Sequence, residues 1–139
     1  MARDYAERAK RFLAEAKNAL TAEDYPTCVR RLQEALEKAS KAALRKLAIE
    51  YPREHDVSEA MDAASNRFPD YMREKLDDIK RMLVKLTADR GPAVYGYEIQ
   101  GIPASEIFTR DYAQETLSAT QPLVELCVKF ATEQVFPEV

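Results

Sequence analysis

Residues 26–50 read PTCVRRLQEALEKASKAALRKLAIE, and this stretch decides the fold class. Its apolar side chains recur every three or four residues, at Val29, Leu32, Leu36, Ala39, Ala43 and Leu47. That spacing is the period of an α-helix, so one side of the segment is apolar along its length. Pro26 suits the first helical turn, where its missing N–H needs no partner. The stretch predicts a central amphipathic helix that ends near Tyr51, because Pro52 disfavours helical geometry in the residue before it.

The rest of the chain supplies helices that cover this central one. Apolar side chains at helical spacing predict long helices over residues 4–21, 69–89 and 109–136, the last capped by Thr109. A shorter helix, capped by Asp56 or Ser58, is predicted to end near Arg67. The short connection TAEDYP makes the first two helices antiparallel neighbours. We therefore expect an all-α protein: one domain over residues 1–139, an up-and-down helical bundle of four long helices plus one short helix.

Residues 90–108, RGPAVYGYEIQGIPASEIF, are predicted to form an ordered loop. They contain all three glycines of the chain and two of its prolines. Loops of this length are usually functional or disordered, and the aromatic and aliphatic side chains here argue against disorder.

Composition excludes several classes of protein. The formal charge is −3, so the surface as a whole does not attract nucleic acid, yet residues 30–46 hold six Lys or Arg against two Glu. The charged N-terminus and the absence of a long apolar run exclude a signal peptide and a membrane span, which favours a cytoplasmic protein. Cys28 and Cys127 both fall in apolar-periodic segments and read as buried, reduced thiols. With one histidine, His55, a Cys/His metal site is ruled out, and no nucleophile motif supports a catalytic triad.

The order and spacing of four blocks resemble a known family. RFLAEAKNAL, DYPTCVRRLQEALEKASKAAL, YPREHDVSEAM and a helix ending before RGPAVYGYE together are similar to the HEPN domain (higher eukaryotes and prokaryotes nucleotide-binding) over nearly the whole chain. The resemblance implies a five-helix bundle, often a homodimer. It also implies a separate minimal nucleotidyltransferase as partner, frequently in a toxin–antitoxin pair.

Toxin members of that family are metal-independent RNases with an arginine and a histidine four to six residues apart, commonly followed by a tyrosine that the partner can modify with AMP. The matching segment here reads Arg90-Gly-Pro-Ala-Val-Tyr95-Gly-Tyr97. The arginine and the last tyrosine match, so the resemblance makes Tyr97 the AMP acceptor. Tyr95 stands where the RNases carry histidine. His55 lies outside this motif and does not restore its spacing.

Two hypotheses follow. In the first, the protein is a non-catalytic or weakly active nucleotide- or RNA-binding partner of a nucleotidyltransferase, with no cofactor beyond a nucleotide ligand. In the second, it is a divergent RNase toxin that uses Arg90 with Tyr95 or Tyr97. Tyrosine, with a pKa of about 10, is a poor base at neutral pH, which favours the first.

Each candidate residue also has a structural interpretation. Lys38, Lys41 and Arg45 form a basic stripe that either receives phosphate or is a solvated helix face. Tyr95 and Tyr97 either belong to the site or pin the long loop onto the bundle.

Overall fold

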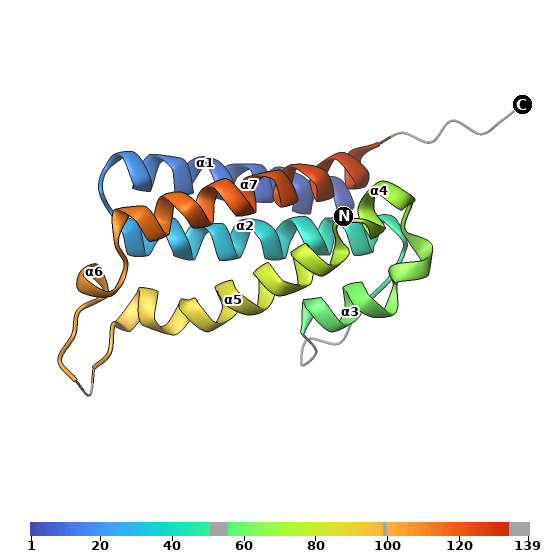
Figure 1. Ribbon diagram of the computed structural model, residues 1–139. Coiled ribbons are helices and arrows are strands. Elements are labelled where there is room, and N and C mark those ends of the chain that lie inside the picture. The colour runs from blue at the N-terminus through green and yellow to red at the C-terminus, as the bar shows by residue number, and fades with distance from the viewer. Residues whose placement is uncertain (51–55, 99, 134–139) are drawn as a thin grey trace, which may run out of the picture.

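The computed structural model describes residues 1–50, 56–98 and 100–133, which form an all-α bundle (Figure 1). Its helices are α1 (Ala2–Thr21), α2 (Tyr25–Lys46), α3 (Val57–Ala63), the 3₁₀ turn η1 (Ser65–Arg67), α4 (Asp70–Arg73), α5 (Leu76–Tyr95), α6 (Ala104–Ile107) and α7 (Arg110–Thr132). The prediction of four long helices in an up-and-down bundle is therefore confirmed. The single short helix expected between them is accompanied by three further short helical segments.

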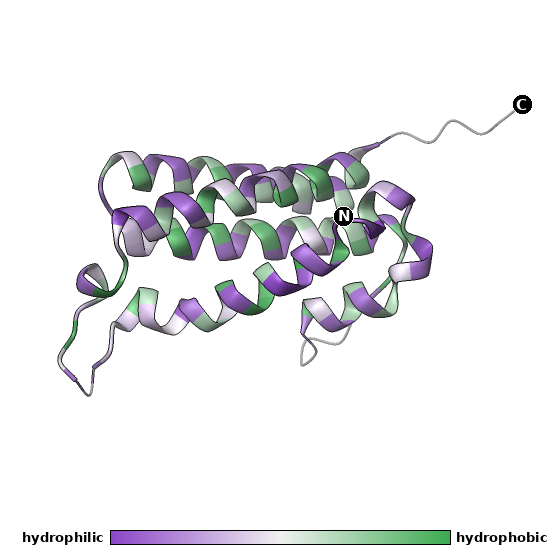
Figure 2. Ribbon diagram, viewed as in Figure 1, coloured by the Kyte–Doolittle hydropathy of each residue, from purple (hydrophilic) through white to green (hydrophobic). Residues whose placement is uncertain are grey.

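The α2 helix lies at the centre of the bundle and packs against α1, α7 and α5. Figure 1 shows α1 and α7 on one side of α2 and α5 on the other. Asp24 caps the start of α2, accepting a hydrogen bond from the backbone N–H of Thr27 at 3.3 Å, and Pro26 occupies the first turn as predicted. Eleven of its side chains are buried, and in Figure 2 apolar green recurs along the helix.

The buried core is built mainly from the apolar stripes read from the sequence. Leu32, Leu36, Ile79, Leu86 and Val124 are all at most 1 % exposed. Burying one such leucine or isoleucine stabilises the fold by about 1.5–3 kcal/mol, so a core of this kind holds the bundle together without a disulfide. Cys28 and Cys127 are both buried and free, which confirms the prediction of reduced thiols.

Helix α2 ends at Lys46, and the predicted end near Tyr51 is wrong. Ala48 takes a left-handed conformation at φ 59°. The Ala48 N–H then bonds the Arg45 carbonyl at 2.9 Å, and the Ile49 N–H bonds the Leu44 carbonyl at 3.0 Å. This is a Schellman motif, which closes a helix by satisfying its last carbonyls. The sequence carries no signal for this motif, because alanine rather than glycine occupies the left-handed position. Tyr51, the predicted end of the helix, lies outside the described residues.

The helix predicted over residues 69–89 differs at both ends. It is interrupted between α4 and α5, where Lys75 adopts φ −105° and ψ 0°. It then continues as α5 through Pro92 to Tyr95, so the first six residues of the predicted loop are helical. A proline disfavours helix in the residue before it partly through that residue's Cβ, and Gly91 has none. The helix stops at Gly96 with φ 67°, and α6 adds a further turn inside the predicted loop.

Helix α7 begins as predicted, with the Thr109 hydroxyl accepting the Tyr112 backbone N–H at 3.1 Å. It ends at Thr132, earlier than the predicted end near Phe136, because Glu133 takes an extended conformation at ψ 129°. Phe136 lies outside the described residues.

The α3 helix is capped by Asp56, one of the two residues predicted for this role. Its carboxylate accepts a hydrogen bond from the Ser58 N–H at 2.9 Å. No helix in the described part of the chain is both long and apolar enough to cross a bilayer.

Candidate functional site

The C-terminal end of α5 leads into a turn in which Tyr97 and Ile102 are hydrogen-bonded to each other. The Tyr97 N–H bonds the Ile102 carbonyl at 2.8 Å and the Ile102 N–H bonds the Tyr97 carbonyl at 3.1 Å, which makes a single antiparallel bridge. Gly96 allows the chain to reverse just before this bridge. A Cβ at that position would lie 2.3 Å from the Ile102 carbonyl oxygen, so only glycine fits. The loop is therefore held by its own backbone.

Tyr95 and Tyr97 lie on either side of Gly96 and border a surface hollow of about 500 Å³. We call it the tyrosine hollow; its lining residues are Gly91, Pro92, Tyr95, Gly96, Tyr97, Glu98 and Gln100. Tyr95 is 68 % exposed and Tyr97 is 45 % exposed. Side chains this exposed do not pin a loop onto a core, so the structural interpretation of the two tyrosines is not supported.

Arg90 is exposed on the last turns of α5. In the described part of the chain its guanidinium has no hydrogen bond or ion pair. The neighbouring residue, Asp89, is firmly held, because its carboxylate accepts a hydrogen bond from the Tyr112 hydroxyl of α7. Burial is the main cause that raises the pKa of Tyr112, and the hydrogen bond to Asp89 raises it further. The phenol therefore keeps its proton and donates this bond at ordinary pH values. The Asp89–Tyr112 bond fixes the end of α5 against α7 and leaves the arginine free to bind a ligand.

The helical continuation of α5 also decides which candidates meet. Arg90 and Tyr95 are five residues apart on one continuous helix, which places them about 140° apart around its axis. Their side chains therefore point to different sides, and the tyrosine hollow includes Tyr95 and Tyr97 but not Arg90. This orientation does not favour the alternative in which Arg90 and Tyr95 of a single copy act at the same phosphodiester bond.

The cations of the basic stripe on α2 lie close to acids. The Lys41 ammonium is 3.1 Å from a Glu37 carboxylate oxygen, and an Arg45 guanidinium nitrogen is 3.1 Å from one of Glu50. The Lys38 ammonium lies 5.7 Å from the centre of the Tyr5 ring, and burial, followed by the charge of Lys41, lowers the pKa of Lys38.

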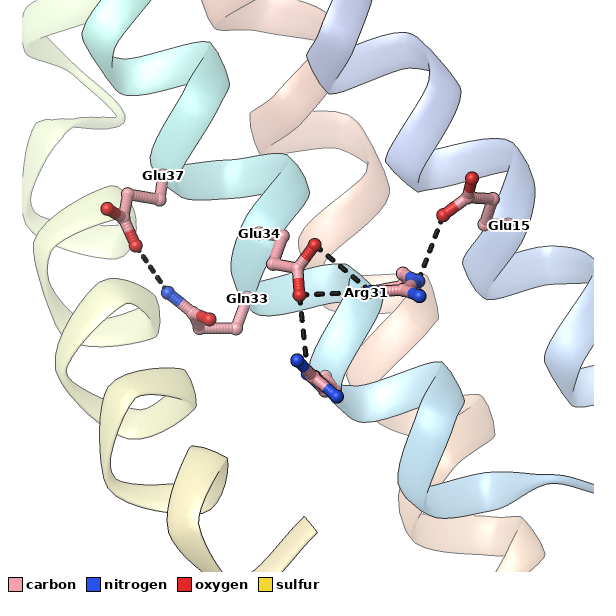
Figure 3. Close-up of polar contacts among 6 residues, drawn as sticks. Glu15, Arg31, Gln33, Glu34 and Glu37 are labelled. Carbon is pink, nitrogen blue, oxygen red and sulfur yellow. Dashed lines mark hydrogen bonds and ion pairs between the residues drawn. The ribbon is translucent and has the colours of Figure 1, made fainter. Parts of the chain in front are cut away.

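The same pattern holds nearer the start of α2. Figure 3 shows Arg31 between Glu34 of its own helix and Glu15 of α1, with Gln33 reaching Glu37. The local positive surplus in the sequence is thus largely compensated in space. Because α2 and α5 run in opposite directions, residues 38–45 also lie away from the end of α5 that carries Arg90 (Figure 1).

Two features of the bundle were not visible in the sequence. Helices α5 and α7 are joined mainly by polar side chains, such as Asp89 with Tyr112 and Lys85 with Thr116, and a second hollow of about 540 Å³ lies between them. Met82, Leu123 and Leu126 line its apolar part, and its charged part is lined by Lys75, Asp78, Arg81 and Lys85. The Asp89–Tyr112 anchor was also missed, since nothing in the sequence pairs residues 23 positions apart on two separate helices.

No metal centre is built into the described residues, among which no group of three or more His, Cys, Asp and Glu side chains is placed to hold an ion. His55, which the sequence left outside the RNase motif, lies outside the residues that the structure describes.

Comparison with known proteins gives the family. The model of the HEPN domain matches residues 2–131, and this chain belongs to the HEPN domain family. Among solved structures, the crystal structure of TT1696 from Thermus thermophilus is similar with a TM-score of 0.67. The two chains are 21 % identical, and the match covers 94 % of this chain and 97 % of that one. At this identity the likeness concerns the fold alone. A search of curated proteins gives no match.

Proposed function

We propose that this protein binds nucleotide or RNA at the C-terminal end of α5 and cleaves RNA weakly or not at all. The observation that carries the proposal is the exposed, unpaired Arg90 close in sequence to Tyr95 and Tyr97, which border a hollow at the end of α5. A guanidinium binds phosphate in a fork of two hydrogen bonds, and tyrosine rings stack on nucleobases. Membership of a family named for nucleotide binding supports the same ligand class.

Weak cleavage follows from the groups that the site lacks. Metal-free RNA cleavage needs a base that takes the 2′-hydroxyl proton close to a cation that holds the phosphate charge. The motif position for the base is Tyr95, which α5 turns away from Arg90. Loss of a positioned base typically costs on the order of 10²–10⁴ in rate. The alternative is a divergent RNase that uses Arg90 with Tyr95 or Tyr97, and RNA cleavage that depends on Arg90 would favour it over this proposal.

The proposed partner is a separate minimal nucleotidyltransferase, in a toxin–antitoxin-like pair, and the protein is proposed to act as a homodimer. Tyr97 is the proposed AMP acceptor. Its side chain is 45 % exposed and follows Gly96, so an enzyme has room to approach the hydroxyl. Lys38, Lys41 and Arg45 remain a second proposed phosphate site, weaker than Arg90 because Lys41 and Arg45 are already paired with Glu37 and Glu50.

The test of binding uses fluorescently labelled structured and single-stranded RNA without added metal. We expect measurable binding that Arg90→Ala weakens at least about tenfold, since a charge-assisted bond contributes about 1.5–3 kcal/mol. Arg3→Ala, which removes an exposed arginine from α1, is the matched control and should bind like the parent. Gel analysis of the same mixtures should show intact RNA; robust cleavage that disappears in Arg90→Ala would establish the RNase instead.

The test of the partnership uses a small nucleotidyltransferase encoded beside this protein, together with labelled ATP. We expect the label on the parent and on Tyr95→Phe, and none on Tyr97→Phe. Equal labelling of Tyr97→Phe would remove the proposed acceptor. Failure of the two purified proteins to associate or react would remove the partnership and leave nucleotide binding intact.

A further inference from the structure

The hollow between α5 and α7 differs in chemistry from the tyrosine hollow. Met82, Leu123 and Leu126 form its apolar floor and belong to, or pack against, the hydrophobic core. No aromatic side chain is found among the described residues that line it, whereas two tyrosines line the other hollow. Because nucleobases bind by stacking on aromatic rings, this floor is suited to an aliphatic group rather than to a base.

The charged side chains that line the hollow all come from the α5 side. Lys75, Arg81 and Lys85 supply three cations and Asp78 supplies one carboxylate, a surplus of two positive charges in a chain whose net charge is −3. Arg81 and Asp78 lie 3.5 Å apart with both side chains more than half exposed, so this ion pair is weak. The Lys75 ammonium has no hydrogen bond or ion pair in the described part of the chain. The α5 wall therefore attracts an anion.

Contacts at both ends hold the two walls of the hollow in place. Towards the C-terminal end of α5, the Lys85 ammonium lies 3.4 Å from the Thr116 hydroxyl and 4.6 Å from the centre of the Tyr112 ring. At the other end, the Lys129 ammonium of α7 lies 4.8 Å from the centre of the Tyr71 ring of α4. The walls themselves are long helices rather than loops. The hollow is thus formed before a ligand arrives, which lowers the entropy cost of binding.

The size of the hollow restricts what can occupy it. Its volume of about 540 Å³ lies within the range of small-molecule sites, about 300–1,000 Å³. Helix α5 rises about 15 Å over the ten residues from Lys75 to Lys85, so the occupant can be elongated. A stable protein interface takes about 20–30 residues on each side, and ten line this hollow.

We propose that the hollow between α5 and α7 binds an aliphatic anion, a hydrocarbon chain of medium length with a carboxylate or phosphate head. The chain lies on Met82, Leu123 and Leu126, and the head lies towards Lys75 and Arg81. The apolar floor and the surplus of cations are both needed, since each alone would suit a neutral lipid or a free inorganic anion. This site is separate from the nucleotide site proposed at the end of α5.

Titration calorimetry with the whole protein tests the chemistry of the ligand. Hexanoate, octanoate and decanoate, each below its micelle concentration, should bind at least about threefold more tightly for every two added methylenes, because each buried methylene contributes to binding. Decyl phosphate should also bind, and the tighter of the two ten-carbon anions identifies the preferred head. Decyltrimethylammonium should not bind. Equal binding of this cation and decanoate would refute the role of the lysines and the arginine, and inorganic phosphate that binds as tightly as decyl phosphate would refute the role of the apolar floor.

A substitution that fills the hollow tests its location. Ala119→Phe places a ring at an exposed position of the α7 wall and should weaken decanoate binding at least about tenfold. Ala14→Phe, at an exposed position of α1, is the matched control and should bind like the parent. Equal affinity in Ala119→Phe and the parent would place the ligand elsewhere.

A charge reversal tests the α5 wall. Lys75→Glu/Arg81→Glu should weaken decanoate binding at least about tenfold. Lys10→Glu/Arg11→Glu makes the same change of net charge at exposed positions of α1 and should bind decanoate like the parent. Equal weakening in both double variants would reveal a general charge effect and contradict a site on α5.

Methionine methyl spectra test the location in the unmodified protein. The Met82 methyl signal should shift on addition of decanoate, whereas the signal of Met61, which is fully buried in the core, should not. A Met82 signal that stays unchanged at saturating decanoate would rule out this hollow.

Two further measurements exclude other occupants. Arg90→Ala should leave decanoate binding unchanged, and Ala119→Phe should leave RNA binding and the molecular mass in light scattering unchanged. A changed mass in Ala119→Phe would mean that a second copy covers the hollow, and weaker RNA binding would assign the hollow to RNA. Either result would overturn the aliphatic ligand, and neither bears on the role proposed for Arg90.

Discussion

At the scale of single residues, Gly96 and Gly101 show what the turn after α5 requires. Both adopt positive φ, 67° and 70°. A Cβ on Gly96 would collide with the Ile102 carbonyl oxygen at 2.3 Å, whereas a Cβ on Gly101 would meet nothing within 4 Å. A residue with a Cβ would therefore be strained by the positive φ at either position. Only at position 96 would its Cβ also collide with a neighbouring atom.

We predict that Gly96→Ala destabilises the protein more than Gly101→Ala. The second substitution carries only the left-handed strain of alanine, about 1–2 kcal/mol. The first adds a steric clash that the Tyr97–Ile102 bridge relieves only by opening. Urea unfolding of both variants measures the difference, and equal losses would show that the bridge does not constrain Gly96.

The two buried thiols give the protein a defined response to alkaline pH. Burial, followed by the charge of Asp24, raises the pKa of Cys28 from 9.0 to about 11. Burial also raises the pKa of Cys127 to about 12, against a smaller opposing effect of the nearby Ser40 hydroxyl. A thiol whose pKa is higher in the folded chain keeps its proton longer there than in the unfolded chain.

We predict that the thiols leave stability unchanged between pH 7 and about 8.5 and lower it as the pH rises from there towards 10, since the unfolded chain then loses protons that the native chain retains. Each thiol contributes at most about 1.4 kcal/mol per pH unit. Above about pH 9 the raised pKa values of Tyr71 and Tyr112 add a loss of the same sign, since unfolded tyrosine titrates near 10, so the contribution of the thiols is read from the cysteine variants. Urea unfolding between pH 7 and 10 should show a flatter profile for Cys28→Ala/Cys127→Ala; an unchanged profile would contradict the burial of the thiols.

At the scale of helices, the sequence predicted what hydrophobic periodicity controls and missed what tertiary contacts control. The four long helices, the place of Pro26 in the first turn of α2 and the Thr109 cap of α7 all rest on local chemistry. The end of α2 was misplaced because Ala48, without the glycine signal, takes the left-handed position.

The end of α5 was misread because a Gly-Pro pair ordinarily signals a turn. Here Gly91 lacks the Cβ that would clash with Pro92, and the Asp89–Tyr112 bond holds the helix against α7. The candidate site could be predicted in part: the sequence located Arg90, Tyr95 and Tyr97 in one segment. Their relative orientation depends on helix phase and on the turn at Gly96, which periodicity does not encode.

Substitution of Pro92 tests whether residues 90–95 are helical, as in the structure, or form a loop, as the sequence predicted. Within a helix, Pro92→Ala restores an N–H to the Ala88 carbonyl and removes a steric clash, and should stabilise the protein by about 1–3 kcal/mol. In a loop the same change would destabilise it by about 0.4–1 kcal/mol, because proline restricts the unfolded chain. Thermal unfolding gives the sign, and a lower Tm would contradict the helical extension to Tyr95.

At the scale of the whole molecule, the charge distribution determines how a polyanion binds. The net charge is −3, so the overall field repels RNA and binding depends on local cations. The α2 cations lie beside Glu15, Glu34, Glu37 and Glu50, whose carboxylates already neutralise much of their charge. Arg90 has no such neighbour bound to it in the described residues. Arg90 can therefore bind phosphate without first breaking an ion pair, whereas the α2 cations must give up a carboxylate partner.

This contrast predicts how RNA affinity depends on salt. Each phosphate that a protein cation neutralises adds about −0.7 to the slope of log K against log salt for single strands. Arg90→Ala should make that slope less steep by about 0.7, besides weakening binding. Lys41→Ala should change the slope by much less, since the phosphate would have to compete with the Glu37 carboxylate 3.1 Å away. Titrations from about 50 to 200 mM salt with both variants measure the two slopes. A larger change in Lys41→Ala than in Arg90→Ala would transfer the phosphate site to α2, and with it the role proposed for Lys38 and Arg45.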